Sequence, residues 1–383
     1  MAVAASPHPQ TPHADSRRRD PASRRAALAG LLNAHDADAM IVGDLVNVRY
    51  LSGFTGSNGA VLVWADTDRG HDRIATDGRY TSQVAAQAPD LEALIARDTV
   101  AVLLAEAAAR RSGVRVAFEA DAMTVAQYDE LTSSDMPDGV ALVPVRGLVE
   151  GLRETKDDDE IAAVERACAL GDQALANLVD RNAIAPGRTE RRVARELEWE
   201  MYSLGADAIA FETIVAAGEN SAVPHHRPTD AVLAPGDFVK IDFGAVYDGY
   251  HSDMTRTFVL GEPADWQREI YEIVRTAQEA GCAALKAGAA TRDVDAAARE
   301  IIVAAGYGKQ YVHGLGHGVG LQIHEAPGIG AASTGTLLDG ATVTVEPGIY
   351  LPGRGGVRIE DTLVVDGSGA RSLTHAPRAL RIL

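Results

Sequence analysis

Two aspartates flank a predicted β-hairpin in the second half of the chain. Asp242 lies in the strand before the turn and Asp253 in the strand after it, and Asp248 followed by Gly249 is a strong signal for a two-residue turn. Centring the turn there places Asp242 opposite Thr255 and makes Asp253 its diagonal neighbour on one face. Two carboxylates on one face repel each other unless a cation or a shared proton lies between them. Hairpin acids are more often solvated, but the apolar V-x-I run before Asp242 favours burial.

The segment 311–325 combines three histidines, His313, His317 and His324, with four glycines. Glycine allows the backbone to approach an ion or a substrate closely. Imidazole binds divalent transition metals and forms hydrogen bonds near neutral pH. A single histidine is more often a structural group, whereas three with this glycine spacing favour a functional site.

Two glutamates belong to predicted strands near the end of the chain. Glu346 follows 342–345, where the valines occupy one face and Glu346 belongs to the other. By the same period of two, Arg358 and Glu360 share a face. Taken alone, Arg358 beside Glu360 fits a surface ion pair as well as it fits a site.

The acids of these segments together predict a two-metal centre. Four carboxylates carry the charge that balances two divalent ions, and one neutral imidazole completes the set. Two metals ~3.5–4 Å apart can activate a water molecule and polarise a carbonyl group, as in aminopeptidases. An oxygen-rich set with one imidazole favours Mn²⁺, Co²⁺ or Fe²⁺, and Zn²⁺ stays possible. We therefore predict a metal-dependent hydrolase whose ligands are Asp242, Asp253, His317, Glu346 and Glu360.

Helices and strands alternate in the first part of the chain, which predicts an α/β unit of about 120 residues. The helices expected there are 23–35 and 99–112, and the strands are 39–42, 60–64 and 114–118. Thr155 is the predicted N-cap of a long helix that runs to about 181. Beyond it we expect helices at 189–204, 265–287 and 291–305, a hairpin at 238–259, and strands at 211–217, 342–350 and 356–365. The predicted domains are a disordered leader (1–22), an N-terminal domain (23–149) and a catalytic domain (150–383).

The composition argues against some partners and favours a reducing compartment. The 383 residues include 36 Lys and Arg against 54 Asp and Glu, for a net charge of −18. Such a surface repels nucleic acids and anionic membranes, so neither is an expected partner. No apolar run is long enough to span a bilayer, and the first residues lack the apolar core of a signal peptide. Cys168 and Cys282 have no CxxC partner, so we expect buried thiols in a cytoplasmic protein.

At these residues the chain resembles the pita-bread metallopeptidases, which include aminopeptidase P, prolidase and, more distantly, methionine aminopeptidase. The motifs IDFG, SDMTRTF, HGLGHGVGLQIHEAP, TVEPGIY and RIED occur in the family's order at similar spacing. The resemblance covers almost everything after residue 22. It implies an α/β (α+β) architecture in which a creatinase-like N-terminal domain precedes a catalytic domain of the pita-bread fold.

The resemblance also implies roles for the predicted ligands. Asp242 would chelate one metal ion, and His317 and Glu346 would chelate the other. Asp253 and Glu360 would bridge the two ions. Glu346 would also carry the proton during hydrolysis.

Four further residues receive roles from the resemblance. His225 would face the substrate, with His226 a competing candidate. His324 would contact the substrate carbonyl and steady the oxyanion. His313 would lie on the proline side of the substrate pocket. Arg358 belongs to the same substrate-binding region and would support Glu360 from behind.

The N-terminal segment 47–54 resembles a loop that reaches a catalytic site, often in a neighbouring subunit. It carries Asn47 where some aminopeptidases P have Asp, which leaves the role of Asn47 open. A homodimer is the family's habit and the commonest oligomer.

The sequence leaves the length of the peptide substrate open. Aminopeptidase P removes the residue before proline from longer peptides, whereas prolidase cleaves Xaa-Pro dipeptides and must recognise a free carboxylate, for which a guanidinium is the natural partner. The chain has no Arg or Lys from 326 to 352. We therefore prefer an Xaa-Pro aminopeptidase acting on peptides with proline at the second position, and keep prolidase as the alternative. Arg354 or an N-terminal arginine could still supply the charge.

Three other functions fit the sequence less well. The N-terminal domain argues against methionine aminopeptidase, which generally lacks it. The five retained ligands argue against creatinase, which works without metal. They also argue against a catalytically silent pita-bread binding protein.

Overall fold

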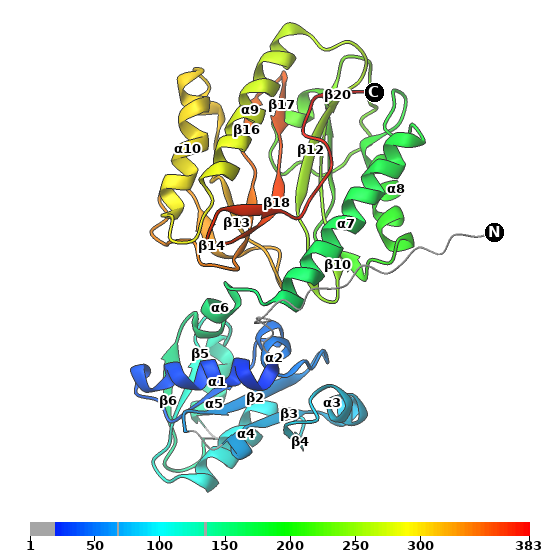
Figure 1. Cartoon of the computed structure of the whole chain (residues 1–383). Helices are drawn as coiled ribbons and strands as arrows, with labels where there is room; N and C mark the ends of the chain where they lie inside the picture. The colour runs from blue at the N-terminus through cyan, green and yellow to red at the C-terminus, as the bar shows by residue number, and fades with distance from the viewer. Residues whose placement is uncertain (1–19, 67–68, 134–135) are drawn as a thin grey trace, which may run out of the picture.

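The computed structural model describes residues 20–66, 69–133 and 136–383 and consists of two domains. In Figure 1 the N-terminal domain lies below the catalytic domain, and α6 (Leu148–Arg153) and the start of α7 (Asp158–Asp180) lie where the two meet. Both domains combine sheets with helices, which confirms the predicted fold class. The predicted leader lies outside the described residues as far as residue 19.

A six-stranded sheet in the order β4-β3-β2-β1-β5-β6 forms the centre of the N-terminal domain. β2 runs antiparallel to both neighbours, and the other neighbouring pairs are parallel. The sequence predicted β1, β2 and β5 but missed β3 and the two edge strands, whose residues are partly exposed and lack a long apolar run. The bounds are β1 (Ala39–Val42), β2 (Gly59–Trp64), β3 (Arg73–Thr76), β4 (Glu92–Ile95), β5 (Arg115–Glu119) and β6 (Ala141–Val145).

Three helices of this domain begin at aspartates that accept hydrogen bonds from free backbone N–H groups. Asp20 caps α1, and Pro21 occupies its first position, so the helix begins at residue 21 rather than 23. Asp44 caps α2 and accepts from the N–H of Asn47. The segment 47–54, expected to be a loop, therefore lies mostly in a helix. The bounds are α1 (Pro21–Leu32), α2 (Leu45–Ser52), α3 (Thr81–Gln87), α4 (Thr99–Arg110) and α5 (Val125–Ser133).

A capping box starts α7, the long helix of the junction. The Asp157 side chain accepts a hydrogen bond from the N–H of Glu160, and the Glu160 carboxylate accepts one from the N–H of Asp157. Thr155, the predicted N-cap, instead pairs with Ala341 in an isolated β-bridge. The helix therefore begins later than predicted.

Two pairs of helices cover the sheets of the catalytic domain. In Figure 1, α9 (Asp265–Ala284) and α10 (Thr291–Ala304) lie on the left, and α7 and α8 (Glu190–Ser203) lie on the right. One apolar core joins α7 and α8 to β8, β9 and β12, and another joins α9 and α10 to β15, β17 and β18. The strand orders are β11-β10-β7, β20-β12-β9-β8, β14-β13-β15-β18-β19 and β16-β17.

The strands of this domain are β7 (Ala208–Ile209), β8 (Ile214–Ala217), β9 (Phe238–Phe243), β10 (Ala245–Tyr247), β11 (Tyr250–His251), β12 (Met254–Val259), β13 (Gly316–Gly318), β14 (Glu325–Ile329), β15 (Thr342–Val345), β16 (Gly348–Leu351), β17 (Gly355–Arg358), β18 (Asp361–Val365), β19 (Ala370–Ser372) and β20 (Arg381–Ile382).

Two predicted strands are each divided in the structure. The strand expected at 342–350 consists of β15 and β16 with Glu346 in the break, and that at 356–365 consists of β17 and β18 with Glu360 in the break. β15 pairs with β18, whereas β16 pairs with β17. Both glutamates therefore lie where the chain passes from one sheet to another.

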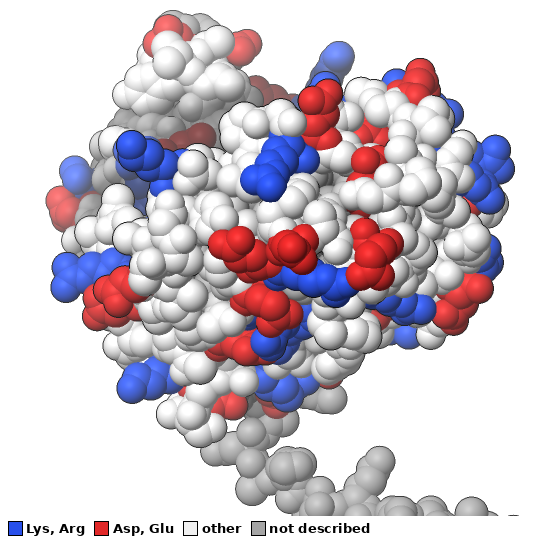
Figure 2. All heavy atoms as spheres, turned by 90° about the horizontal axis from the view of Figure 1, so that it is seen from above, with Lys and Arg blue, Asp and Glu red and all other residues white. Residues whose placement is uncertain are grey.

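On the face shown in Figure 2, basic side chains alternate with acidic ones and form no continuous stripe. Within the described ranges, no helix combines the length and the apolar character that a bilayer crossing requires.

Candidate metal centre and active site

The hairpin that carries the two aspartates has the predicted register. Asp242 in β9 pairs with Thr255 in β12, and Asp253 lies directly before β12. The turn between β10 and β11 has positive φ at Asp248 (44°) and at Gly249 (70°). This combination suits the twist of the flanking strands. The turn therefore fixes the register that brings both aspartates to one end of the sheet.

The structure brings the predicted site residues together in one cavity of about 1040 Å³. Ligand atoms of Asp253, His317 and Glu360 all lie within 4.8 Å of one another. The Nε2 atom of His317 is 3.4 Å from Oε1 of Glu346 and 3.6 Å from Oδ2 of Asp253. The predicted residues that line the cavity are His225, Asp242, Asp253, His313, His317, His324, Glu346, Arg358 and Glu360.

Burial and mutual repulsion raise the pKa of three of the acids. Burial and the charge of Glu360 hold the pKa of Asp253 well above its ordinary value, and burial and Glu346 do the same for the pKa of Glu360. Burial raises the pKa of Glu346 to about 7, with Asp242 adding to the effect and Arg358 opposing it. The cluster therefore holds more carboxylates than Arg358, the buried cation beside it, can balance.

The donor set fits divalent cations. Oδ1 of Asp242 is buried and has no hydrogen-bond partner among the described residues. A buried carboxylate oxygen without a partner is unfavourable, so its geometry favours a ligand from outside the chain. Four carboxylates and one imidazole suit Mn²⁺, Co²⁺ or Fe²⁺. The residues that would hold the ions are Asp242, Asp253, His317, Glu346 and Glu360.

His317 has the charge state that a metal ligand needs. Burial lowers its pKa to about 4, so the ring is neutral at neutral pH. Its Nδ1 lies 3.0 Å from the carbonyl oxygen of Gly318, so we infer that Nδ1 carries the proton. The lone pair of Nε2 then faces the acids, as in metal sites whose second ring nitrogen donates to a carbonyl.

Arg358 is buried behind the acids and commits its guanidinium to protein atoms. It donates to Asp242, to Oγ1 of Thr255 at 2.9 Å and to the hydroxyl of Tyr350 at 2.9 Å. Thr255 in turn donates to Oε2 of Glu360 at 2.7 Å. Arg358 therefore reaches Glu360 through Thr255, a residue that the hairpin register already placed beside Asp242.

Sequence reasoning missed three polar neighbours of the site. The hydroxyl of Tyr350 lies 2.9 Å from Nε2 of His313. The Nζ atom of Lys240 donates to the backbone carbonyls of the two residues before His225, at 2.6 and 3.1 Å. Thr344 donates to the carboxylate that follows β15. Strand parity could have found Lys240 and Thr344, whereas Tyr350 is marked only by its place at the end of the TVEPGIY motif.

The two adjacent histidines differ in their surroundings. Nε2 of His226 lies 2.8 Å from Oε2 of the fully buried Glu190. His225 is exposed on the cavity side, and burial together with the charge of Arg358 lowers its pKa. His226 is therefore engaged by the protein, which supports the preference for His225. Across the cavity, the ring of His324 packs edge-on against His317, with centroids 4.4 Å apart.

A largely buried cluster of carboxylates with one neutral imidazole, opening into a large cavity, defines a metal-dependent hydrolase. Comparison with known proteins identifies the family. The model of metallopeptidase family M24 matches residues 162–367, and that of the creatinase/prolidase N-terminal domain matches residues 24–155. The chain belongs to metallopeptidase family M24, which confirms the resemblance, the pita-bread fold and the metal-dependent peptidase class.

Similar proteins include both kinds of Xaa-Pro peptidase. The Xaa-Pro dipeptidase of Pyrococcus furiosus is 46% identical over 233 residues, which is 61% of this chain and 66% of that protein. The structure of the Xaa-Pro dipeptidase from Bacillus anthracis has a TM-score of 0.89 at 37% identity, covering 95% of this chain and 100% of that one. The X-Pro aminopeptidase of Thermotoga maritima has a TM-score of 0.82 at 33% identity, covering 94% and 99%.

Proposed function

We propose that this chain is an Xaa-Pro dipeptidase that uses two divalent metal ions. The observation that supports this proposal most strongly is that four carboxylates and one neutral imidazole meet in a cavity lined by further histidines. The dipeptidases of Pyrococcus furiosus and Bacillus anthracis support the dipeptide as substrate. This choice departs from the aminopeptidase preferred on the sequence, because the comparisons favour the alternative.

Arginines on the cavity wall support recognition of a free carboxylate. Arg354 stacks on Trp266 at 4.3 Å from the ring centroid, and it is not among the cavity residues. Arg191 and Arg195, one helical turn apart on α8, do line the cavity. Arg191 pairs with Asp230, whereas Arg195 is exposed and has no ion pair in the described part of the chain. Arg195 is therefore the proposed partner of the dipeptide carboxylate.

The residues around the centre divide the remaining work. When bound, the metal ions would lower the pKa of a water molecule and polarise the scissile carbonyl. Glu346 accepts a proton and returns it to the proline nitrogen that leaves. His324 donates to the oxygen of the tetrahedral oxyanion. His313, held by Tyr350, contacts the proline side, and burial keeps its pKa at about 4 and its ring neutral.

The proposal also covers the metal ion, the cellular compartment and the oligomeric state. Mn²⁺ is the proposed ion, because the donor set is oxygen-rich and contains no thiolate. Cys168 is buried and free, Cys282 is half-buried and free, and both fit the proposed cytoplasmic location. A homodimer stays the proposed assembly.

A substrate panel tests the proposal. Metal is removed with a chelator, Mn²⁺ is restored, and kcat/KM is measured for an Xaa-Pro dipeptide, its C-terminal amide and an Xaa-Pro-Yaa tripeptide. We expect the dipeptide to be hydrolysed fastest. A protein that carries its metal and hydrolyses none of the three contradicts the proposal.

An Xaa-Pro aminopeptidase is the second candidate. Two observations favour it, namely the absence of Arg and Lys from 326 to 352 and the likeness to the Thermotoga maritima enzyme. In the same panel this activity gives a tripeptide rate above the dipeptide rate. The amide then reacts at least as fast as the free dipeptide, because no site for a carboxylate is needed.

A further inference from the structure

A buried polar chain begins in α2 of the N-terminal domain. Asn47 is fully buried, and its Nδ2 donates to Oε1 of Glu119 and to Oε1 of Glu150, both at 2.6 Å. Its Oδ1 accepts a hydrogen bond from Nη1 of Arg153 at 2.7 Å. The Asn47 amide is therefore satisfied at both ends within its own chain. The resemblance suggested instead that its segment would reach a catalytic site.

The chain continues from Arg153 into the catalytic domain. Nη2 of Arg153 donates to Oε1 of Glu325 at 2.5 Å and to the side chain of Gln322 at 2.8 Å. Nζ of Lys156 donates to Oε2 of Glu325 at 3.0 Å. The side chains of Arg153, Lys156 and Glu325 are 3%, 1% and 5% exposed. Although burial alone would raise it, the two cations hold the pKa of Glu325 below its ordinary value.

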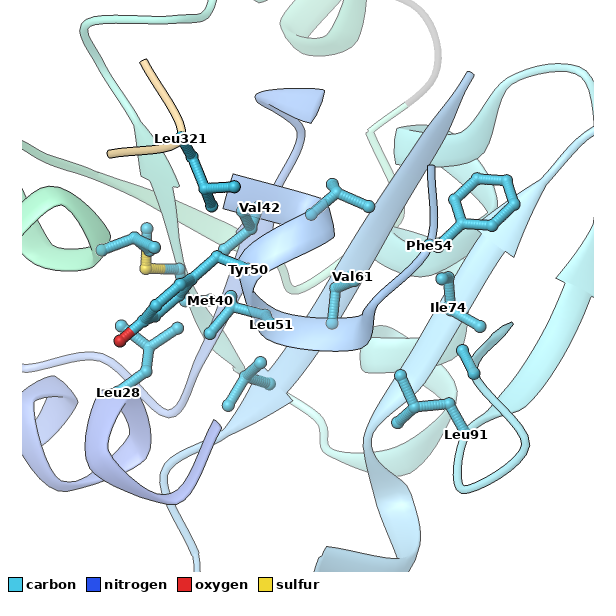
Figure 3. Close-up of a cluster of buried hydrophobic side chains, with 14 of the residues drawn as sticks. Leu28, Met40, Val42, Tyr50, Leu51, Phe54, Val61, Ile74, Leu91 and Leu321 are labelled. Atoms are coloured by element: carbon cyan, nitrogen blue, oxygen red, sulfur yellow. The ribbon is translucent and has the colours of Figure 1, made fainter. Parts of the chain in front are cut away.

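An apolar contact holds the other end of the same loop. Leu321 is 7% exposed and packs into an apolar core cluster that joins the N-terminal domain to α7 and other parts of the catalytic domain. Figure 3 shows Leu321 entering from a separate segment and pointing toward Val42 and Tyr50. The carbonyl of the preceding Gly320 also accepts a hydrogen bond from the N–H of His251 at 2.8 Å. The loop is thus fixed on both sides of His324.

His324 itself has little else to orient it. It is exposed, and its ring forms no hydrogen bond with the residues that the structure describes. Among the described residues, the only aromatic ring that it contacts is that of His317, which it meets edge-on. The direction of the imidazole therefore depends on where the backbone between Leu321 and Glu325 is held.

We propose that Glu325, clamped by Arg153 and Lys156, is a positioning residue for His324, and that Asn47 of α2 holds Arg153 in place. Through this clamp the N-terminal domain sets the geometry of a group that acts on the substrate carbonyl. The inference rests on the proposed Xaa-Pro hydrolysis, since that reaction gives His324 its role. In this proposal Asn47 acts on the active site of its own chain, by holding Arg153, and not on that of a neighbouring subunit.

Substituting Glu325→Gln tests the clamp in the Mn²⁺-loaded full-length protein. The amide keeps the size of the side chain but cannot pair with two cations. Because misplacing a catalytic group by about 1 Å can lower a rate 10²-fold, we expect kcat to fall between about 10- and 100-fold. KM should change less than about threefold, and the metal content should equal that of the wild type. Glu325→Gln combined with Arg153→Met should lower kcat no further than the stronger single variant, because both break one clamp.

Asp72→Asn is the matched control. Asp72 pairs with the 4%-exposed Arg25 inside the N-terminal domain and is itself buried, but this pair lies outside the chain that ends at Glu325. The control should lose stability and keep kcat. Arg153→Lys is a milder variant that retains a cation, and it serves if the double variant fails to fold. Its kcat should lie between those of the wild type and Arg153→Met.

A second measurement separates the clamp from the reaction. In metal-free protein labelled at its histidine Cε1 atoms, where no paramagnetic Mn²⁺ broadens the signals, the His324 NMR signal is assigned by its loss in His324→Ala. The clamp predicts that this signal shifts or broadens in Glu325→Gln and stays in place in Asp72→Asn. A wild type that hydrolyses no Xaa-Pro peptide sinks the proposed function, while the NMR signal still reports on the clamp. An unmoved signal, a kcat within twofold of wild type, or an equal loss in Asp72→Asn overturns the inference.

Discussion

Two groups of buried charge lie close together in this protein and behave in opposite ways. In the proposed metal centre, the pKa values of Asp253 and Glu360 are raised by burial and by neighbouring acids. At the clamp, the pKa of Glu325 is lowered because Lys156 and Arg153 outweigh the effect of burial. Buried carboxylates that the chain balances with its own cations serve structure. Those it leaves unbalanced mark a place for cations from solution.

Removing a ligand from the unbalanced group should have the largest effect. Asp253→Ala should lower the metal content below two ions per chain and kcat/KM by roughly three orders of magnitude, because the activated water depends on the ions. Metal is counted by mass spectrometry and turnover is followed with an Xaa-Pro dipeptide. Glu325→Gln, at the balanced group, is the control that should keep its metal. An Asp253→Ala protein that is active without metal would contradict the assignment.

Neutral substitutions should shift stability in opposite directions at the two groups. In metal-free protein at pH 8, Glu360→Gln should raise the free energy of unfolding, because it removes a charge that burial and Glu346 disfavour. Glu325→Gln should lower it by about 3–5 kcal/mol, since two buried cations lose their partner. The folded-state pKa of Glu325 is lowered, so its contribution exists above the ordinary pKa and is lost as pH falls through the folded value.

Denaturant titrations at pH 8 and at pH 4 measure both shifts. The difference between Glu325→Gln and wild type should shrink at pH 4. For Glu360 the sign is reversed: its raised pKa favours the folded state at low pH, and this stability is lost as pH rises. The gain in Glu360→Gln should therefore be greatest at pH 8. Two changes of the same sign would remove the distinction between the groups.

Metal binding should release protons from the unbalanced group. In metal-free protein below pH 7, Glu346, whose pKa is raised to about 7, still holds its proton. The ions must displace this proton. As the pH falls below 7, Mn²⁺ affinity should therefore weaken about tenfold per pH unit for each proton released. Calorimetry at pH 6 in buffers of different ionisation enthalpy counts these protons. A heat independent of the buffer would contradict the raised pKa.

The smallest expected effect concerns Arg195 at the cavity wall. Arg195→Met should lower kcat/KM for an Xaa-Pro dipeptide about tenfold, the loss expected for one charge-assisted hydrogen bond. The C-terminal amide of the same dipeptide, which has no carboxylate, should react as before. The exposed Arg192, on the same helix and absent from the cavity lining, gives the matched control Arg192→Met. An equal loss for the dipeptide and its amide would remove Arg195 from carboxylate recognition.

Much of the candidate metal centre was predictable because local rules place its residues. The turn at Asp248 and Gly249 sets the register of Asp242 with Thr255, and strand parity sets the face of Glu346. The breaks at Glu346 and Glu360 were not predictable, because they arise where two sheets exchange strands. Those breaks bring both glutamates into the cavity.

The clamp was beyond prediction for a different reason. Asn47 and Glu325 are far apart in the sequence, and neither lies in a pattern whose period predicts a contact between them. Their connection through Arg153 forms only when the two domains pack together. The segment 47–54 was assigned to a loop from its resemblance, whereas the cap at Asp44 begins a helix there.

The most direct test of the central claim is a titration of Mn²⁺ into metal-free protein while hydrolysis of an Xaa-Pro dipeptide is followed. We predict that turnover appears as two ions bind per chain, and that Asp253→Ala neither binds both ions nor gains activity. Turnover that persists in full after chelation, or two ions bound per chain without any hydrolysis, would contradict the account.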